Sequence, residues 1–187
     1  MVRVWFAVCV WVLGLAWGQT RLPQIPLQTP VYGPFQVEKV LAGNRFLVAG
    51  RVFGLAGVEV FAADERTARA QARRLGVAYR ANAAETARGC LGKLVRERPV
   101  YLELEDQGVL GDALWGYAYF PFDPSPQRVI LLTRPLFVYG GNLLENVNVL
   151  LLREGCGWFT EPQPLKYRDA LQWAQEQARK DPRGIWR

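Results

Sequence analysis

Arginine side chains are the feature of this chain whose number and spacing point most clearly to a chemistry. Arg66, Arg69 and Arg73 recur at intervals of three and four residues, which places them on one face of a helix. Such a stripe can contact the phosphates of nucleic acid, or the charges of another polyanion, without reading sequence. The alternative interpretation is a solvated helix face, which is the usual role of a charge run. The candidate polyanion-binding residues are Arg66, Arg69, Arg73, Arg74 and Arg80.

Histidine is absent from the chain, which has 23 basic and 17 acidic residues and a formal net charge of +6. This absence removes the commonest general base and every Ser-His or Cys-His nucleophile pair. Zinc sites are built mainly from cysteine and histidine, so three cysteines without a histidine argue against one. We therefore expect no cofactor, while the modest positive charge favours polyanionic partners.

The N-terminal residues 1–18 have the pattern of a cleaved signal peptide. Arg3 is followed by an apolar stretch, and Ala16-Trp17-Gly18 provides a small-x-small cleavage site. The apolar stretch is shorter than the ~20 residues that span a bilayer. We expect export to the periplasm or the extracellular space, with no stable membrane span in the mature chain. The alternative is a membrane anchor formed by residues 4–17.

Two cysteines, Cys90 and Cys156, remain beyond the predicted signal peptide. An exported protein meets an oxidising environment in which a cysteine pair can be bridged. The alternative is that both are small buried hydrophobic residues. Spacing does not decide between a disulfide and two separate thiols, because a disulfide requires a specific geometry.

The composition divides the chain into the signal peptide, a proline-rich tether at 19–34 and one domain at 35–187. The tether carries four prolines among polar residues, which favours an extended and loosely ordered segment. From residue 35 the pattern changes to short β-type runs separated by turn-like Ala-Gly steps. These runs predict an antiparallel meander of three strands at 35–41, 45–48 and 51–60.

Residues 62–98 are rich in Ala, Arg, Leu and Glu and are predicted to be mostly helical, with a break near Gly76. Leu91, Leu94 and Val95 have the spacing of a core-facing stripe. The rest of the middle region predicts strands at 100–105 and 112–120, a loop at 122–126, and an extra strand or hairpin at 128–139.

The C-terminal region predicts two further helices. Asn148 is expected to cap the first helix, which runs through Arg153 and ends at Gly155 in the left-handed conformation. The last helix presents one apolar face, made of Tyr167, Ala170, Leu171, Ala174 and Ala178.

Tyr117 and Tyr119 share one face of the strand predicted at 112–120. Aromatic side chains on an exposed strand face can stack on nucleic-acid bases. The alternative is that both belong to the core.

This order of elements is typical of a five-stranded OB-type barrel, mainly β with about three helices (α+β). Within it, Asn146-Val-Asn and the following Arg153-Glu-Gly resemble the Asn-Val-Asn helix and its ending in the staphylococcal nuclease family. Gly184-Ile-Trp is similar to the Gly-Leu-Trp that closes that family's terminal helix. Lys93-Leu-Val and Val100-Tyr-Leu-Glu resemble its first helix and fourth strand. The chain thus resembles a thermonuclease-like domain.

The resemblance also implies where an active site would lie. The family's calcium-binding carboxylates fall on Asn44 and Glu59, its phosphate-binding arginines on Gly54 and Asp112, and its general base on Ala62. Only Glu59 keeps the expected charge, which makes it a weak metal candidate. The chemistry needs a calcium clamp, a base and two arginines. The resemblance therefore implies a degenerate active site in which no catalytic residue is expected.

Asp64 and Glu65 lie just beyond the position of the base and provide an alternative active site, with Arg45 or Arg51 replacing a lost arginine. The simpler interpretation of the two acidic residues is that they complement the dipole at the start of a helix.

Three functions remain open from the sequence. The first is an exported, catalytically inactive module that binds nucleic acid or another polyanion. The second is a structural or protein-interaction domain of the cell envelope, with an envelope protein as its partner. The third is a residual calcium-dependent phosphodiesterase of DNA or RNA, the one case that requires calcium.

Overall fold

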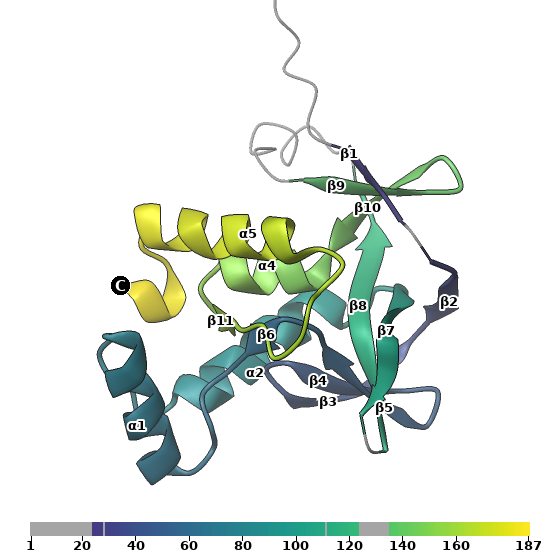
Figure 1. The fold of residues 1–187 in the computed structure, drawn as a ribbon. Coiled ribbons are helices and arrows are strands. Elements are labelled where there is room, and N and C mark those ends of the chain that lie inside the picture. Colours follow the sequence, from purple (N-terminus) through teal and green to yellow (C-terminus); the bar gives the residue numbers. More distant parts are fainter. Residues whose placement is uncertain (1–23, 28, 111, 124–134) are drawn as a thin grey trace, which may run out of the picture.

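The computed structural model describes residues 24–27, 29–110, 112–123 and 135–187 (Figure 1). The predicted signal peptide, the alternative anchor and the first part of the hairpin predicted at 128–139 lie outside these residues. The strands are β1 (Gln24–Pro26), β2 (Val31–Phe35), β3 (Val37–Ala42), β4 (Arg45–Val48), β5 (Arg51–Leu55), β6 (Val58–Glu59), β7 (Val100–Leu110), β8 (Ala113–Pro121), β9 (Leu136–Tyr139), β10 (Asn142–Asn146) and β11 (Trp158–Phe159). The helices are α1 (Glu65–Leu75), α2 (Ala83–Val95), α4 (Val147–Arg153), α5 (Arg168–Lys180) and the 3-10 turn η1 (Gly184–Trp186).

The predicted meander is confirmed, because β3, β4 and β5 pair antiparallel in sequence order. β5 pairs parallel with β8, and β8 pairs antiparallel with both β7 and β10. β6 and β11 form a separate two-stranded ladder. The mixed α+β class and the OB-type arrangement are confirmed. The main sheet has nine strands rather than five, and the described residues form four α-helices rather than about three.

The hydrogen-bonded ladder is not closed, because the strand order ends at β3. β2 pairs with β7 and β3 pairs with β4, while Gln36 alone separates β2 from β3. One bent segment of chain therefore runs from the edge beside β7 to the edge beside β4. The barrel is open along β3, because the segment pairs with β7 through β2 only and β3 does not continue this pairing.

The prediction of a loosely ordered tether is wrong for the part of 19–34 that the structure describes. β1 pairs parallel with β9, and β2 pairs antiparallel with β7. Proline removes a backbone donor and is excluded from central strands, but it is tolerated on edge strands. β1 and β2 each pair on one side within the described sheet. The prolines therefore fit the edges of the fold.

The main core lies between the sheet and the helices α2, α4 and α5 (Figure 1). Phe46 and Phe53 stack at 5.4 Å between ring centroids within the meander. The predicted stripe on α2 is confirmed, since Leu91 and Val95 are buried and Leu94 packs against the core. The predicted apolar face of α5 is confirmed as well, and all five of its residues are buried.

Asn148 does not cap its helix, so that prediction is wrong by two residues. Asn146 occupies the cap, where its Oδ1 accepts a hydrogen bond from the Val149 N–H at 3.0 Å. Asn148 is fully buried, and its Nδ2 donates to the carbonyls of Ala56 at 2.8 Å and Gly116 at 3.1 Å. The two asparagines thus have separate roles, one local and one tying α4 to the sheet.

Tyr117 and Tyr119 are fully buried. Of the two roles open from the sequence, the core role is confirmed and the base-stacking surface is wrong. Their rings pack against Tyr167 and Phe137 respectively. The Tyr119 hydroxyl donates to Glu103 at 2.7 Å, and the Tyr117 hydroxyl donates to Glu105. Burial, followed by the effect of Glu103, raises the pKa of Tyr119 well above its usual value. The covered face of β7 and β8 is a buried polar core rather than a binding platform.

Helix α1 stands apart from α4 and α5, near the C-terminus (Figure 1). It packs through Ala68 and Ala72 into a smaller core with Phe61 and Trp158, whose rings lie 5.1 Å apart. The predicted helix break is confirmed at Gly76, which ends α1 with φ 68°. Among the described residues no helix has the length and apolar character needed to cross a membrane.

Candidate functional site

Three of the positions implied by the family resemblance, Asn44, Gly54 and Glu59, lie near the β3–β4 turn and the end of β5. Asn44 is 6% exposed, and its Nδ2 donates to the carbonyl of Val58 at 2.9 Å. The Asn44 carbonyl accepts a hydrogen bond from the N–H of Leu55 at 2.9 Å. These bonds bring Asn44 beside the residues next to Gly54 and Glu59. The amide of Asn44 serves there as an internal donor that holds β6 to the turn.

Gly54 has no room for a side chain. It pairs with Arg45 on one side and with Trp115 on the other. A Cβ built at Gly54 would lie 2.4 Å from Cε3 of the Trp115 ring. The indole ring therefore fills the space that an arginine at this position would need to leave the strand.

Gly54→Ala is expected to lower the free energy of unfolding by about 2 kcal/mol, because overpacking a close contact costs ~1–3 kcal/mol. Trp115→Ala should remove most of this loss in a double-mutant cycle measured by urea denaturation. Gly89→Ala is the matched control, since a Cβ there meets no atom within 4 Å. If Gly54→Ala lowered the free energy of unfolding equally in the presence of Trp115 and in the Trp115→Ala background, the Trp115 ring would not be the cause of the loss.

The other family positions carry no assembled catalytic group. Glu59 is half-buried on β6 and pairs with Trp158. The N–H of Ala62 donates to Oε1 of Gln71 at 2.9 Å, which ties it to α1. Asp112 is exposed in the turn before β8. Among the described residues no group of three His, Cys, Asp or Glu side chains is placed to hold a metal ion.

Asp64 and Glu65 both stabilise the start of α1. Asp64 is the N-cap, and its Oδ1 accepts a hydrogen bond from the Thr67 N–H at 2.8 Å, which lowers the pKa of the Asp64 carboxyl. Glu65 accepts a hydrogen bond from Nε of Arg69 at 2.8 Å. The interpretation of these two residues as helix-start residues is confirmed.

Arg66, Arg69, Arg73 and Arg74 form an arginine stripe on the side of α1 away from the buried Ala68 and Ala72. All five candidate arginines, including Arg80 beyond the helix, are exposed. Arg69 pairs with Glu65, and its guanidinium lies 4.6 Å from the ring centroid of Tyr79. Arg80 follows the helix, and its Nη2 donates to the carbonyl of Arg187 at 3.4 Å. Two of the five predicted residues are thus partly engaged by the protein itself.

Arg73 and Arg74 keep exposed guanidinium groups at the last turn of α1. Their side chains make no hydrogen bond or ion pair with another described residue. Cations in a last turn also complement the helix dipole, which accounts for part of their presence. Together with the exposed Arg66, they form the part of the stripe that is open to an anionic ligand.

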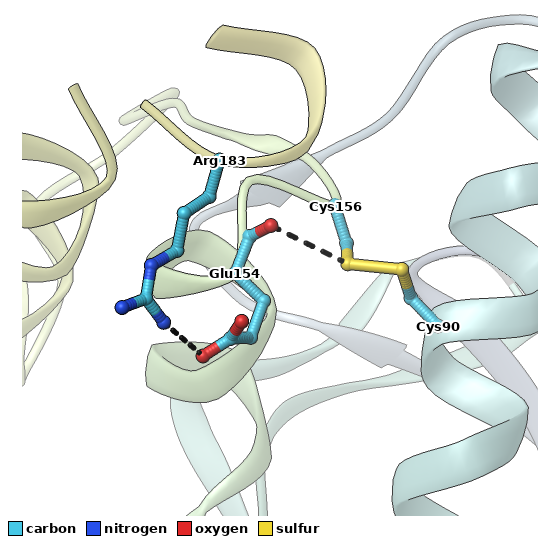
Figure 2. Close-up of a disulfide and its surroundings, with 4 residues drawn as sticks. All are labelled: Cys90, Glu154, Cys156 and Arg183. Carbon is cyan, nitrogen blue, oxygen red and sulfur yellow. Dashed lines mark hydrogen bonds and ion pairs between the residues drawn. A yellow bond between two sulfur atoms is a disulfide. The ribbon is translucent and has the colours of Figure 1, made fainter. Parts of the chain in front are cut away.

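The structure joins Cys90 of α2 to Cys156, which follows α4, in a disulfide (Figure 2). The Sγ of Cys156 also contacts the Glu154 carbonyl at 4.0 Å, and Glu154 Oε1 pairs with Nη1 of Arg183 at 3.0 Å (Figure 2). The bridge therefore lies where α2, the end of α4 and the C-terminal segment meet. Of the two interpretations open from the sequence, the structure has the bridged pair.

Sequence reasoning missed the buried carboxylates of β7. Glu103 is completely buried and accepts hydrogen bonds from three hydroxyl groups, including Thr29 Oγ1 at 2.6 Å. Glu105 accepts a hydrogen bond from the backbone N–H of Lys166 at 3.0 Å. Alternation alone would place two glutamates at i and i+2 on a solvated face. Tyr117 and Tyr119, two residues apart on the next strand, could have indicated this arrangement, because their hydroxyl groups can bind two buried carboxylates on the same face.

Comparison with known proteins finds a family similarity for the C-terminal part of the chain. Residues 133–187 match the family model described as "Staphylococcal nuclease homologue". The matched stretch contains both Asn146 and Trp186, and it ends at the last residue of the chain. No curated protein matches the chain. All five family-site positions lie outside the matched stretch, so the match supports the fold and does not bear on the chemistry.

Proposed function

We propose that this staphylococcal-nuclease-like domain is a non-catalytic module that binds nucleic acid or another polyanion through the arginine stripe on α1. The supporting observation is the pair of exposed guanidinium groups of Arg73 and Arg74, beside the exposed Arg66 on the same helix. Phosphate contacts of this kind are sequence-independent and depend strongly on salt.

Loss of catalysis is the second part of the proposal. Phosphodiester hydrolysis requires a base and cationic groups aimed at the developing charge. Ala62 has no group that accepts a proton, Trp115 occupies the space beside Gly54, and Asp112 would repel phosphate. Each missing donor of this type removes about 100 to 1,000-fold in rate.

A location outside the cytoplasm is also part of the proposal. It rests on the predicted signal peptide at 1–18 and on the Cys90–Cys156 disulfide. Disulfides form and persist in oxidising compartments and are rare in the cytosol.

Arg73→Glu/Arg74→Glu is expected to weaken binding of fluorescent single-stranded DNA at least about tenfold. Losing two phosphate contacts should also reduce the slope of log K against log salt by about 1.4. Fluorescence anisotropy over a salt series measures both quantities. Lys39→Glu/Lys93→Glu is the matched control, because it changes the net charge equally at exposed lysines of β3 and α2.

Two results would overturn the proposal. Equal weakening by the two double variants would show that binding follows net charge rather than the α1 stripe. Cleavage of the DNA or of a matching RNA with calcium, absent with chelator and abolished by Glu59→Ala, would show a working nuclease.

A further inference from the structure

A groove of about 700 Å³ runs between β3 and α2 on the side where the barrel is open. One wall is the strand segment Val37–Val40, and the other is the face of α2 from Glu85 to Val95 with Arg96 and Glu97 just after the helix. This volume is within the range of ligand-binding clefts in proteins. The groove is separate from α1 and from all five family-site positions.

β3 presents its edge to this groove rather than one of its faces. Successive side chains of a strand point to opposite faces, yet four consecutive residues of β3 line the groove. β3 is also the last strand in the sheet order and pairs with β4 alone among the described strands. Its outer N–H and C=O groups form no other backbone hydrogen bond within the described part of the chain. A free edge of this kind is a template for pairing with another strand.

Two glycines of α2, Gly89 and Gly92, line the groove. A Cβ built at Gly89 or at Gly92 meets no atom within 4 Å, so packing within the chain does not require glycine at either position. Glycine in a helix interior is destabilising relative to alanine. The space above both residues allows another backbone to approach the helix closely.

The charges along the groove favour an acidic occupant. Arg88 is paired with Glu85 at 2.7 Å, and Oε1 of Glu38 accepts a hydrogen bond from the Gly50 N–H at 2.8 Å. Three further cations line the groove: Lys39, Lys93 and Arg96. Their exposed side chains form no ion pair with another described residue. Glu38 and Glu97 oppose them in the lining, so the charge of the groove is only slightly positive.

We propose that β3 accepts an extended acidic peptide from a partner protein by strand addition. The peptide backbone pairs with the free edge of β3, and its carboxylates contact Lys39, Lys93 and Arg96. In strand addition the main-chain hydrogen bonds supply affinity, and the flanking side chains supply specificity. This site adds a protein partner to the proposed polyanion-binding function and does not depend on it.

The test is titration of the ¹⁵N-labelled full chain with an acetylated and amidated peptide of alternating threonine and glutamate, followed by NMR. The expected result is a saturable shift of the backbone amides of Val37–Val40 and of the groove face of α2. A second peptide with N-methyl groups on alternate residues keeps the side chains but loses backbone donors. We expect it to bind at least about tenfold more weakly, as should a threonine-lysine peptide.

Two pairs of variants locate the site. Gly89→Leu should fill the groove and abolish the shifts, while Thr86→Leu on another face of α2 should leave them unchanged. Lys39→Glu/Lys93→Glu should weaken the peptide at least about tenfold, while Arg73→Glu/Arg74→Glu should not. Circular dichroism and thermal melting check that each variant is folded.

Three outcomes would overturn the proposal. One is the absence of a saturable shift at peptide concentrations up to about 1 mM, where a complex with a Kd of that order would be half-formed. Another is equal binding of the N-methylated peptide, which would show attraction by charge alone. The third is competition by single-stranded DNA with shifts in the same groove, which would make the groove a nucleic-acid surface. Failure of DNA binding to α1 would leave this site intact, because the two double variants separate the two surfaces.

Discussion

Replacement of both Cys90 and Cys156 by serine is expected to lower the free energy of unfolding by about 4 kcal/mol. The disulfide closes a loop across 66 residues, so it removes many conformations from the unfolded chain. Its loss also frees α2 from the segment after α4, where Glu154 and Arg183 pair (Figure 2).

Differential scanning calorimetry of the full chain measures this effect. For a domain of this size, about 4 kcal/mol corresponds to a fall of roughly 10 °C in melting temperature. Reductant should lower the melting temperature of the unchanged protein by a similar amount and leave the double variant unaffected. Equal melting temperatures for the unchanged protein with and without reductant would contradict the prediction.

Replacement of Glu103 by alanine is expected to cost about 3 kcal/mol or more. The carboxylate is completely buried and accepts hydrogen bonds from the hydroxyls of Thr29 at 2.6 Å, Tyr119 at 2.7 Å and Tyr167 at 2.9 Å. Its removal leaves these hydroxyls without their acceptor in the core, at a cost of ~1–3 kcal/mol for each unsatisfied group. It also leaves a cavity.

The position of Glu103 explains the size of this effect. Thr29 lies in the N-terminal segment, Tyr119 on β8 and Tyr167 at the start of α5, so one side chain joins three distant parts of the chain. Lys166 strengthens the same junction, because its Nζ donates to the carbonyl of Leu104 at 2.6 Å and contacts Thr29 Oγ1 at 3.3 Å.

Urea denaturation at neutral pH provides the measurement. Glu103→Gln keeps the shape and one acceptor, and we expect it to lose about 1 kcal/mol. Tyr119→Phe and Tyr167→Phe remove one donor each and, combined with Glu103→Ala, should be far from additive. A Glu103→Ala protein within about 0.5 kcal/mol of the unchanged protein, the range of ordinary surface substitutions, would refute the account.

Local pattern predicted most of the elements in this fold. Short β-type runs separated by turn-like residues identified β3, β4 and β5, and the spacing of the apolar residues identified the buried faces of α2 and α5. Gly76 and Gly155 adopt positive φ at the ends of helices, where glycine has no steric penalty. These features depend on residues close together in the chain.

Features that depend on a distant partner were wrong or missed. The prolines of 19–34 suggested a tether, yet β1 and β2 pair with β9 and β7. Asn148 looked like a cap because asparagine favours that position, but Ala56 and Gly116 supply its partners. Glu103 and Glu105 were missed, because the hydroxyl groups that bind them belong to Tyr119 and Tyr117 of the neighbouring strand β8.

The sequence by itself determined which chemical groups the family positions contain. A glycine at 54 and an alanine at 62 provide neither a cation nor a base in any conformation. Only the tertiary structure decided that the Trp115 ring fills the space beside Gly54, that Cys90 meets Cys156, and that β3 keeps a free edge along a groove. The reason is physical: composition limits what a side chain can do, whereas contacts between residues far apart in the chain are made by packing and strand pairing.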